Sequence, residues 1–365
     1  MRIAQVAPLA ESVPPKLYGG TERVVHWLAE ELVEQGHKVT LFASGDSRTR
    51  ASLVPIIPRA LRLGRPRQDP SAACAALLAD LMDRAGEFDI IHAHIDWVHL
   101  PMLQHGRVPF LTTLHGRIDL PGLDKVLARF PGAPFVSISD DQRKPLPGLR
   151  WLGTVYHGLP QRDLAPRFEK GAYLAFLGRL APEKGAHVAI SLARRAGQPL
   201  RIAAKLPRSQ SRYFREQIQP LVDDRLIRLA GEVDDGRKAE FLANASALLF
   251  PIDWPEPFGL VMIEAMACGT PVIAFRRGSV PEVIEHGVTG FVVDTEDEAL
   301  QAIADIPKLD RRRIRARFEQ RFTAKRMTDA YVALYASLAS GRIKPKVEIA
   351  TSRLAAAGSQ EAEVL

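Results

Sequence analysis

Cysteine, long apolar runs and several familiar cofactor motifs are scarce or missing in this chain. Its only cysteines, Cys74 and Cys268, are too few and too far apart to form a disulfide framework or a cysteine-based metal site. No apolar run reaches the length of about 18 residues that a membrane-spanning helix needs, and the first residues lack the charged, apolar and small-residue zones of a signal peptide. We therefore expect a protein of the reducing cytoplasm.

The missing motifs also exclude classes of function. No Gly-x-Gly-x-x-Gly follows the first expected strand, which disfavours a dinucleotide-dependent oxidoreductase, and the Gly-x-x-x-x-Gly-Lys-Ser/Thr loop of nucleotide triphosphatases is absent. No Asp-x-Asp pair is present to hold a metal-bound diphosphate, so we expect neither a metal nor a resident cofactor. Helix-turn-helix, zinc and aromatic-basic patterns are missing too, which argues against nucleic acid as a partner.

What the sequence does contain is a regular alternation of short apolar runs with amphipathic helical segments. The runs that we interpret as strands are Ile3–Ala7, Val39–Ala43, Phe88–Ala93, Phe110–Leu114, Phe135–Ile138 and Thr154–Tyr156, followed by Tyr173–Leu177, Leu200–Ala204, Leu226–Leu229, Ala247–Phe250, Val272–Ala274 and Gly290–Val293. The expected helices between them include Thr21–Gln35, with Thr21 as its cap, Ala72–Arg84, Leu123–Arg129, Ala186–Ala196, Arg237–Asn244 and Leu260–Cys268. This alternation predicts parallel sheets with helices on both faces.

The length of 365 residues suits two such domains better than one. The segment Gly158–Gly171 has little periodicity and two prolines, and we interpret it as the linker and hinge. We therefore expect one domain over residues 1–165, a second over 166–320, a helix over 321–340 that packs across both, and a flexible tail over 341–365. The predicted fold class is α/β, with two doubly wound Rossmann-like domains that face each other across a cleft, where the carboxyl ends of the strands meet.

The most informative run extends from Phe250 to Ala274, where an expected strand leads through a proline-rich loop into a helix that starts near Gly259. The free backbone N–H groups and the dipole of such a helix start favour a diphosphate. Glu256 precedes this point and can bind sugar hydroxyls, and Glu264 inside the helix can reach a ribose diol. The alternative is that Glu256 only caps the helix and Glu264 is a surface charge.

A second strand-end loop carries two cations. It runs from Phe176 to Gly185 and contains Arg179 and Lys184. Two cations on one such loop can clamp a diphosphate and stabilise it as a leaving group. The alternative is a surface turn built around a salt bridge to Glu183.

With these two motifs the sequence closely resembles the family-4 retaining glycosyltransferases of the GT-B fold. Their signature is two glutamates separated by seven residues within E-x-F-G-L…E-A-M-A-x-G-x-P-V, and Glu256 and Glu264 match it. The resemblance covers roughly residues 1–340. It implies that Glu256 contacts the transferred sugar, Glu264 contacts the ribose, and Arg179 and Lys184 stabilise the leaving diphosphate. The phosphates would be held by backbone along Pro257, Phe258, Gly259 and Leu260.

The resemblance gives a role to residues that are weak signals alone. The paired glycines Gly19 and Gly20 follow the first expected strand, and in the family such a loop lies beside the donor phosphate. His115 follows a strand and precedes a glycine, as does the family's histidine that contacts the sugar near its reacting carbon. The residues that we assign, more weakly, to the acceptor side are Tyr18, His94, Asp96 and Trp97.

Three further positions leave alternatives open. His92 and His94 have the spacing of a metal pair, but no partner ligand is evident, and we favour packing or acceptor-side hydrogen bonding. Lys205 stands at a strand end where many relatives have glycine, so it either adds a phosphate contact or is exposed. Val233 lies where the family holds the nucleotide base through backbone contacts, which says little about which base is bound.

The formal net charge of +7 is concentrated in two arginine runs. The first consists of Arg48, Arg50, Arg59, Arg62, Arg65 and Arg67, and the second of Arg311, Arg312, Arg313, Arg315, Arg317 and Arg321. Such runs are compatible with peripheral contact with an anionic membrane at its inner face, although a solvated helix face or loop is the simpler interpretation.

The predicted function is therefore retaining, metal-independent transfer of a sugar from a nucleotide diphosphate sugar to an acceptor that the sequence does not identify, whether a saccharide, a lipid-linked sugar or a small molecule. The family makes UDP-glucose the first expected donor and GDP-mannose the next. The implied mechanism is a front-face displacement in which the leaving phosphate takes the acceptor's proton. The alternatives are a sugar-nucleotide epimerase or phosphorylase on the same fold, or a non-catalytic basic binding protein.

Overall fold

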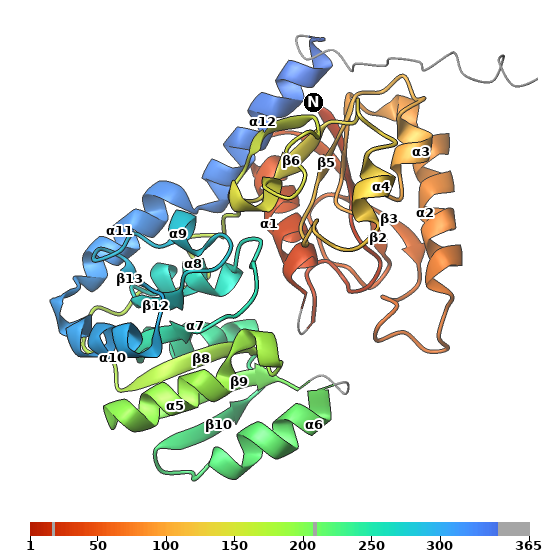
Figure 1. Cartoon of the computed structure of the whole chain (residues 1–365). Helices are drawn as coiled ribbons and strands as arrows, with labels where there is room; N and C mark the ends of the chain where they lie inside the picture. The colour runs from red at the N-terminus through yellow and green to blue at the C-terminus, as the bar shows by residue number, and fades with distance from the viewer. Residues whose placement is uncertain (17–18, 207–209, 342–365) are drawn as a thin grey trace, which may run out of the picture.

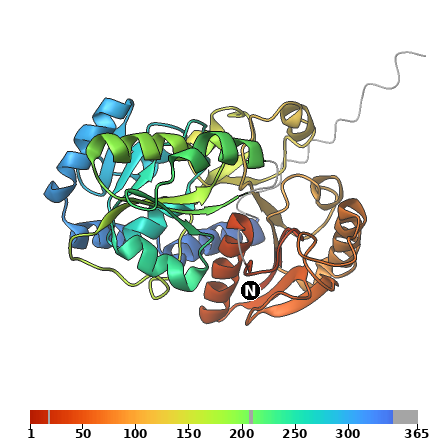
Figure 2. The ribbon, with the colours of Figure 1, turned by 90° about the horizontal axis from the view of Figure 1, so that it is seen from below.

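The computed structural model describes residues 1–16, 19–206 and 210–341 (Figure 1). They form two α/β domains, each built on one parallel sheet, and the expected pair of doubly wound sheets is confirmed. Figure 2 shows the two domains side by side, with the sheet of the C-terminal domain enclosed between layers of helices. Tyr18 and residues 342–365 of the expected tail lie outside the described residues.

The N-terminal sheet has seven strands in the order β3-β2-β1-β4-β5-β6-β7. Its strands are β1 (Arg2–Val6), β2 (Lys38–Ser44), β3 (Ser52–Ile57), β4 (Ile90–Ala93), β5 (Phe110–Thr113), β6 (Phe135–Ser137) and β7 (Trp151–Thr154), with the helices α1 (Gly20–Glu34), α2 (Pro70–Asp83), α3 (Leu100–Leu103) and α4 (Leu123–Leu127) between them. Since every pair of strands is parallel, their carboxyl ends share one edge of the sheet.

The C-terminal sheet has six strands in the order β10-β9-β8-β11-β12-β13. Its strands are β8 (Tyr173–Arg179), β9 (Leu200–Lys205), β10 (Ile227–Gly231), β11 (Ala245–Phe250), β12 (Val272–Phe275) and β13 (Gly290–Val293). The helices are α5 (Ala186–Ala196), α6 (Ser211–Tyr213), α7 (Asp235–Ala243), α8 (Leu260–Ala267), α9 (Val280–Val283), α10 (Glu296–Asp305), α11 (Arg311–Arg321) and α12 (Ala324–Ala339). The strand order reverses between β1 and β4 in the N-terminal sheet and between β8 and β11 in the C-terminal sheet. Open parallel sheets bind ligands at such a point.

Local structure departs from the sequence expectations in three places. Strand β3 is missing from the strands expected from the sequence; its Pro55 cannot donate to a ladder and is tolerated because β3 is the outermost strand of its sheet. The N-cap of α1 is Gly19, so the prediction that Thr21 caps this helix is wrong. The strand expected at 154–156 is β7 and lies three residues earlier.

The last helix, α12, packs against the N-terminal domain although it follows the C-terminal one in sequence. It contacts α1 and β4, and Figure 1 shows it running along the N-terminal domain. The chain thus crosses between domains twice, and the crossings touch: Leu159 donates its N–H to the carbonyl of Phe322 at 3.0 Å, and Ala324 donates to the carbonyl of Leu159 at 2.9 Å. A Cβ on Gly158 would lie 2.1 Å from the Thr323 oxygen, so only glycine fits there.

Four arginines of the second run make contacts within the protein. Arg311 is buried, and its guanidinium donates to the carbonyls of Arg167, Ala245 and Ala243 and to the Thr270 hydroxyl, each at 2.8 Å. The contacts of the others include those of Arg315 to the carbonyls of Leu164 and Ala267, and those of Arg317 and Arg321 to Glu285. These four arginines hold α11 onto its domain, whereas Arg312 and Arg313 are exposed, as on a solvated helix face.

Candidate active site

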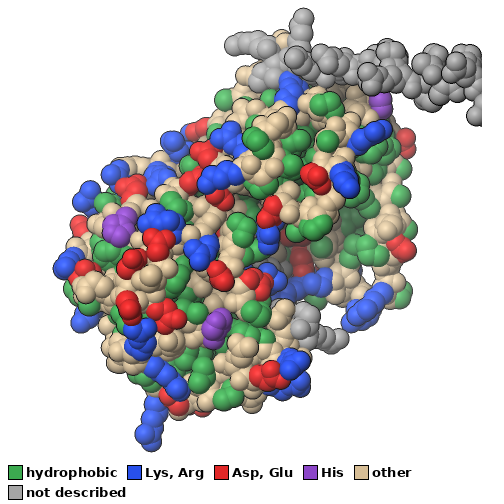
Figure 3. Space-filling view, in the orientation of Figure 1, with side chains coloured by type: hydrophobic (Ala, Val, Ile, Leu, Met, Phe, Trp, Pro, Cys, Tyr) green, Lys and Arg blue, Asp and Glu red, His purple; other side chains and the backbone are tan. Residues whose placement is uncertain are grey.

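A cavity of about 410 Å³ lies between the two domains, at the carboxyl ends of both sheets. Figure 3 shows the hollow between the domains from outside. The predicted site residues that line the cavity are Gly19, Gly20, His115, Arg179, Lys184, Lys205, Val233, Glu256, Pro257, Phe258, Gly259, Leu260 and Glu264. The structure therefore brings together residues that are spread over more than two thirds of the chain.

The start of α8 forms one wall of this cavity. Gly259, its N-cap, has φ 79°, a left-handed conformation that favours glycine, and a Cβ there would lie 2.8 Å from the Met262 methyl group. No side chain caps this helix start, so the first N–H groups, including those of Leu260 and Val261, are left for a ligand. The helix dipole adds a partial positive charge at the same point. This wall is suited to binding an anion.

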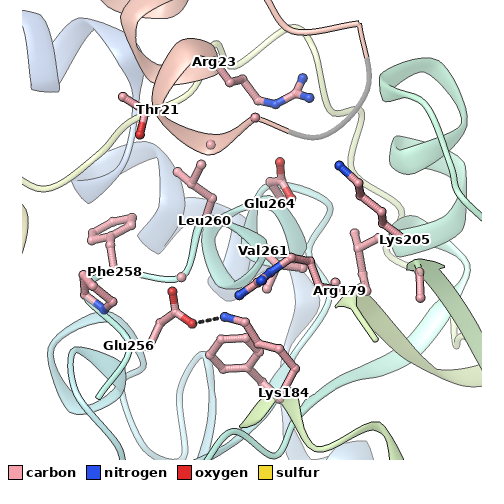
Figure 4. Close-up of a pocket in the computed structure, with 18 of the residues that line it drawn as sticks. Thr21, Arg23, Arg179, Lys184, Lys205, Glu256, Phe258, Leu260, Val261 and Glu264 are labelled. Atoms are coloured by element: carbon pink, nitrogen blue, oxygen red, sulfur yellow. Dashed lines mark hydrogen bonds and ion pairs between the residues drawn. The ribbon is translucent and has the colours of Figure 1, made fainter. Parts of the chain in front are cut away.

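Beside this helix start, Lys184 and Glu256 form an ion pair, drawn as a dashed line in Figure 4. The same carboxylate oxygen accepts a hydrogen bond of 2.8 Å from the Trp254 indole N–H. The Lys184 ammonium also lies 4.4 Å from the centroid of the Trp254 ring, within range of a cation–π interaction. Lys184 and Glu256 are only 12% and 13% exposed, so three contacts hold both charges in place inside the cavity.

Arg179 carries a polar group that lacks a partner. Its buried Nε–H has no hydrogen-bond partner within the described residues. The only ion pair that the structure shows for the Arg179 guanidinium is with Glu183 on the same loop, and it is long, at 3.4 Å. The expected alternative of a surface salt-bridge turn is therefore present but weak. Figure 4 shows Arg179, Lys184 and Lys205 projecting into the cavity from the ends of β8 and β9 and the loop after β8. Buried donors normally have partners, so this N–H indicates a ligand.

Glu264 is paired inside the cavity. Its carboxylate lies 2.7 Å from the Lys238 ammonium of α7, and the two side chains are 7% and 13% exposed. The alternative of a surface charge is therefore wrong for Glu264. The pair holds the carboxylate in a fixed position beside α8, where its second oxygen can accept hydrogen bonds from a ligand's hydroxyls.

The histidines form a buried group behind the cavity wall. His115 lines the cavity, and its Nε2 lies 2.8 Å from Nδ1 of His94. His94 does not line the cavity. Its Nε2 lies 2.8 Å from the side-chain carboxamide oxygen of Gln5. Both ring nitrogens of His92 are hydrogen-bonded, to Tyr335 and Thr113, which supports packing for His92 and His94. Burial lowers the pKa of His115 to about 3, so its ring is neutral.

Of the residues expected on the acceptor side, those that the structure describes do not line this cavity. Tyr18 lies outside the described residues. Asp96 and Trp97 follow β4, and Asp96 has a left-handed backbone with φ 55°. Burial raises the pKa of the Asp96 carboxyl. The assignment of these residues to the acceptor side therefore stays a prediction.

Sequence reasoning missed several residues that line the cavity, namely Thr21, Arg23, Arg117, His157, Lys238 and Trp254. Trp254 had a usable signal, because it precedes Glu256 by two residues in a strand-end loop. Arg23 had one as well, since it follows the paired glycines by one turn at the start of α1. No sequence pattern indicated His157 or Lys238, because only the fold brings them to the cavity.

Comparison with known proteins yields two family models that follow each other along the chain. Residues 18–166 match the model described as Glycosyltransferase Family 4, and residues 161–322 match Glycosyl transferases group 1. A glycogen synthase of Mycobacterium tuberculosis (strain ATCC 25618 / H37Rv) is 27% identical over 91% of this chain and 94% of that protein. A phosphatidyl-myo-inositol mannosyltransferase of Mycolicibacterium smegmatis is 27% identical over 98% of this chain and 99% of its own length.

Among solved structures, Anabaena Alr3699/HepE in complex with UDP-glucose has a similar fold. The TM-score is 0.71, with 20% sequence identity, over 93% of this chain and all of that chain. At this level of identity the likeness concerns the fold. Both the sequence models and the fold thus cover the two domains whose facing edges form the cavity.

Proposed function

Because the chain belongs to the family-4 glycosyltransferases and has their GT-B fold, we propose that it transfers a hexose from a nucleotide diphosphate sugar to an acceptor hydroxyl with retention of anomeric configuration. The observation that carries this proposal is the convergence of Arg179, Lys184 and Glu256 on the uncapped start of α8 within one cavity. The cations and the helix start suit a diphosphate, and the carboxylate suits a sugar.

In the proposed reaction, the bond between the anomeric carbon and the diphosphate oxygen breaks, and the acceptor oxygen bonds to that carbon from the same face. The departing phosphate oxygen takes the proton of the acceptor hydroxyl. Arg179, Lys184 and the N–H groups of α8 stabilise the charge that develops on the diphosphate. These groups supply the positive charge that a metal provides in other transferases, so we propose that the reaction needs no metal.

The proposed donor is UDP-glucose, with GDP-mannose as the second candidate. Glu264, held by Lys238, is in our proposal the carboxylate that binds the ribose, and Val233 borders the part of the cavity that would take the base. The acceptor is a hydroxyl compound of a class that the described cavity does not specify. A phosphorylase, the main alternative, would require orthophosphate for turnover, so turnover without added phosphate separates the two.

A thermal-shift panel of UDP-, GDP- and ADP-sugars, each with and without EDTA, tests the donor proposal. A ligand at a hundred times its Kd stabilises the native state by about 2.7 kcal/mol. We expect UDP-glucose to raise Tm by a few degrees, and EDTA to leave that rise unchanged. A rise that EDTA abolishes would contradict metal independence, and no rise with any of the sugars would contradict the donor site.

We also propose a peripheral contact with anionic lipid through the loop that follows β3. Arg59, Arg65 and Arg67 are exposed on this loop, and Leu63 beside them is 43% exposed. Basic side chains flanking an apolar one match the chemistry of an anionic bilayer surface. Within the described residues, no helix is both long and apolar enough to span a membrane, so any lipid contact in this part of the chain involves the surface alone.

Co-sedimentation with vesicles checks this contact. We expect the protein to pellet with vesicles that contain phosphatidylglycerol and to stay in solution with pure phosphatidylcholine. Each arginine near such a surface contributes roughly 1 kcal/mol, so the triple change of Arg59, Arg65 and Arg67 to glutamine should lower partitioning on the order of 100-fold. Arg313→Gln on α11 is the matched control. Equal partitioning to both vesicle types would refute the contact.

A further inference from the structure

An unbroken chain of hydrogen bonds leads from the cavity through the interior of the N-terminal domain to α12. His115 Nε2 meets His94 Nδ1 at 2.8 Å, and His94 Nε2 meets the Gln5 carboxamide oxygen at 2.8 Å. The Gln5 amide nitrogen then donates to the Tyr335 hydroxyl at 3.1 Å. From Tyr335 the chain continues through His92 and Thr113 to Tyr331, with contacts of 2.7, 2.7 and 3.0 Å. We call these seven residues the relay.

All members of the relay except His115 are buried, and none of its side chains carries a formal charge. Burial lowers the pKa values of His92 and His94 well below the ordinary value and raises those of Tyr331 and Tyr335. A neutral imidazole has one nitrogen that donates and one that accepts. The donor direction chosen at one member of the relay therefore dictates the direction at the next.

The orientation of Gln5 sets this direction towards the cavity. Its carboxamide oxygen faces His94 and can only accept, so His94 Nε2 must carry the proton. His94 Nδ1 is then an acceptor, and His115 must donate to it from Nε2. The remaining nitrogen, His115 Nδ1, therefore carries no proton and can accept a hydrogen bond. It is buried and has no hydrogen-bond partner within the described residues.

We propose that Gln5 is a positioning residue that fixes His115 in the Nε2–H tautomer through His94, so that Nδ1 is kept as an acceptor for a hydroxyl of the bound substrate. Tyr335 on α12 holds Gln5 in this orientation, because its hydroxyl accepts the Gln5 amide N–H. The substrate part of this inference rests on the proposed function; the tautomer part does not.

Changes at Gln5 and at Tyr335, two neighbouring members of the relay, have different consequences. With methionine at position 5, the His94 Nε2–H would lose its acceptor and be buried unpaired, which is costly. His94 then loses its preference for the Nε2–H tautomer, and when its proton moves to Nδ1, His115 must carry its proton on Nδ1 as well. With phenylalanine at position 335, the Gln5 carboxamide loses its orienting partner and can turn over, which gives a mixture of both tautomers.

Long-range ¹H–¹⁵N correlation spectra of the ligand-free protein, labelled with ¹⁵N-histidine, report the tautomer directly. Loss of signals in His115→Gln assigns His115 among the ten histidines. We expect the wild type to show a protonated Nε2 and an unprotonated Nδ1 at His115. Gln5→Met and Tyr335→Phe should each introduce the Nδ1–H form. Thr112→Val is the matched control, because Thr112 is a buried neighbour of Thr113 whose hydroxyl bonds to His99, outside the relay.

A protonated Nδ1 in the wild type would overturn the inference, as would an unchanged His115 in both variants. Tyr335→Phe keeps the buried ring, so it serves as the test if Gln5→Met does not fold. In turnover assays we expect Tyr335→Phe to lower kcat by about tenfold, the effect of losing an orienting partner, with little change in the donor KM. If the tautomer shifts but no sugar is transferred by the wild type, the relay stands and the proposed function fails.

Discussion

Replacing Lys184 with alanine is expected to lower kcat on the order of 10²- to 10³-fold, the effect of removing one group aimed at charge that develops in a transition state. Lys184 is partly buried and touches Glu256 and Trp254, so its charge acts in a medium where water screens it little. Steady-state kinetics with saturating donor measure the effect. Lys184→Arg should retain more activity than Lys184→Ala, because it keeps the positive charge.

The control for this change is Lys308→Ala, which removes an exposed lysine that pairs with Asp305 on the surface. We expect it to match the wild type in both kcat and Tm. If Lys184→Ala folds normally and turns over at a near-normal rate, Lys184 does not stabilise the leaving group, and Arg179 with the α8 start would have to do so alone.

Glu256→Gln should reduce kcat by about 100-fold while leaving the fold intact. The change keeps the shape of the side chain, and an amide oxygen can still accept the Trp254 indole N–H. It removes the negative charge that, in our proposal, contacts the transferred sugar, whose ring becomes positively charged in the transition state. A larger loss in kcat than in donor binding, with binding measured by thermal shift, would place the effect in the transition state.

Glu169→Gln is the matched control, since Glu169 is an exposed carboxylate paired with Arg167. The double variant Lys184→Ala/Glu256→Gln adds information, because the two side chains form one ion pair and their effects should not be additive. Full activity in Glu256→Gln would show that its charge takes no part in the reaction.

The sequence predicted the donor side of the site well, for a physical reason. Parallel strands place all their carboxyl ends at one edge, so charged or glycine-rich loops after different strands must converge once the strands are identified. Arg179 at the end of β8, Gly259 after β11 and Gly19 after β1 all line one cavity for this reason. Identifying the strands was enough to place these residues.

What the sequence did not predict depends on helix register and on backbone conformation. Lys238 reaches Glu264 only because α7 and α8 pack at a particular rotation, which no local pattern specifies. Asp96 follows a strand, as His115 does, yet it does not line the cavity, and its left-handed backbone could not be read from the sequence. The burial of Arg311 was also hidden, because an arginine that bonds to four internal oxygens cannot be told from a solvated one by composition.

The chain passes from one domain to the other at Leu159 and back again at Thr323. These two passages limit how segments of this protein could be exchanged with those of its relatives. The N-terminal domain is built from two segments of the chain, residues up to about 158 and the helix α12. Helix α12 supplies Tyr331 and Tyr335 to the interior of this domain. A hybrid that took everything after the linker from another parent would replace these tyrosines and break contacts to Gln5, His92 and Thr113. The exchangeable module is therefore an internal insert that ends at Phe322, and α12 must be inherited together with the first half of the chain.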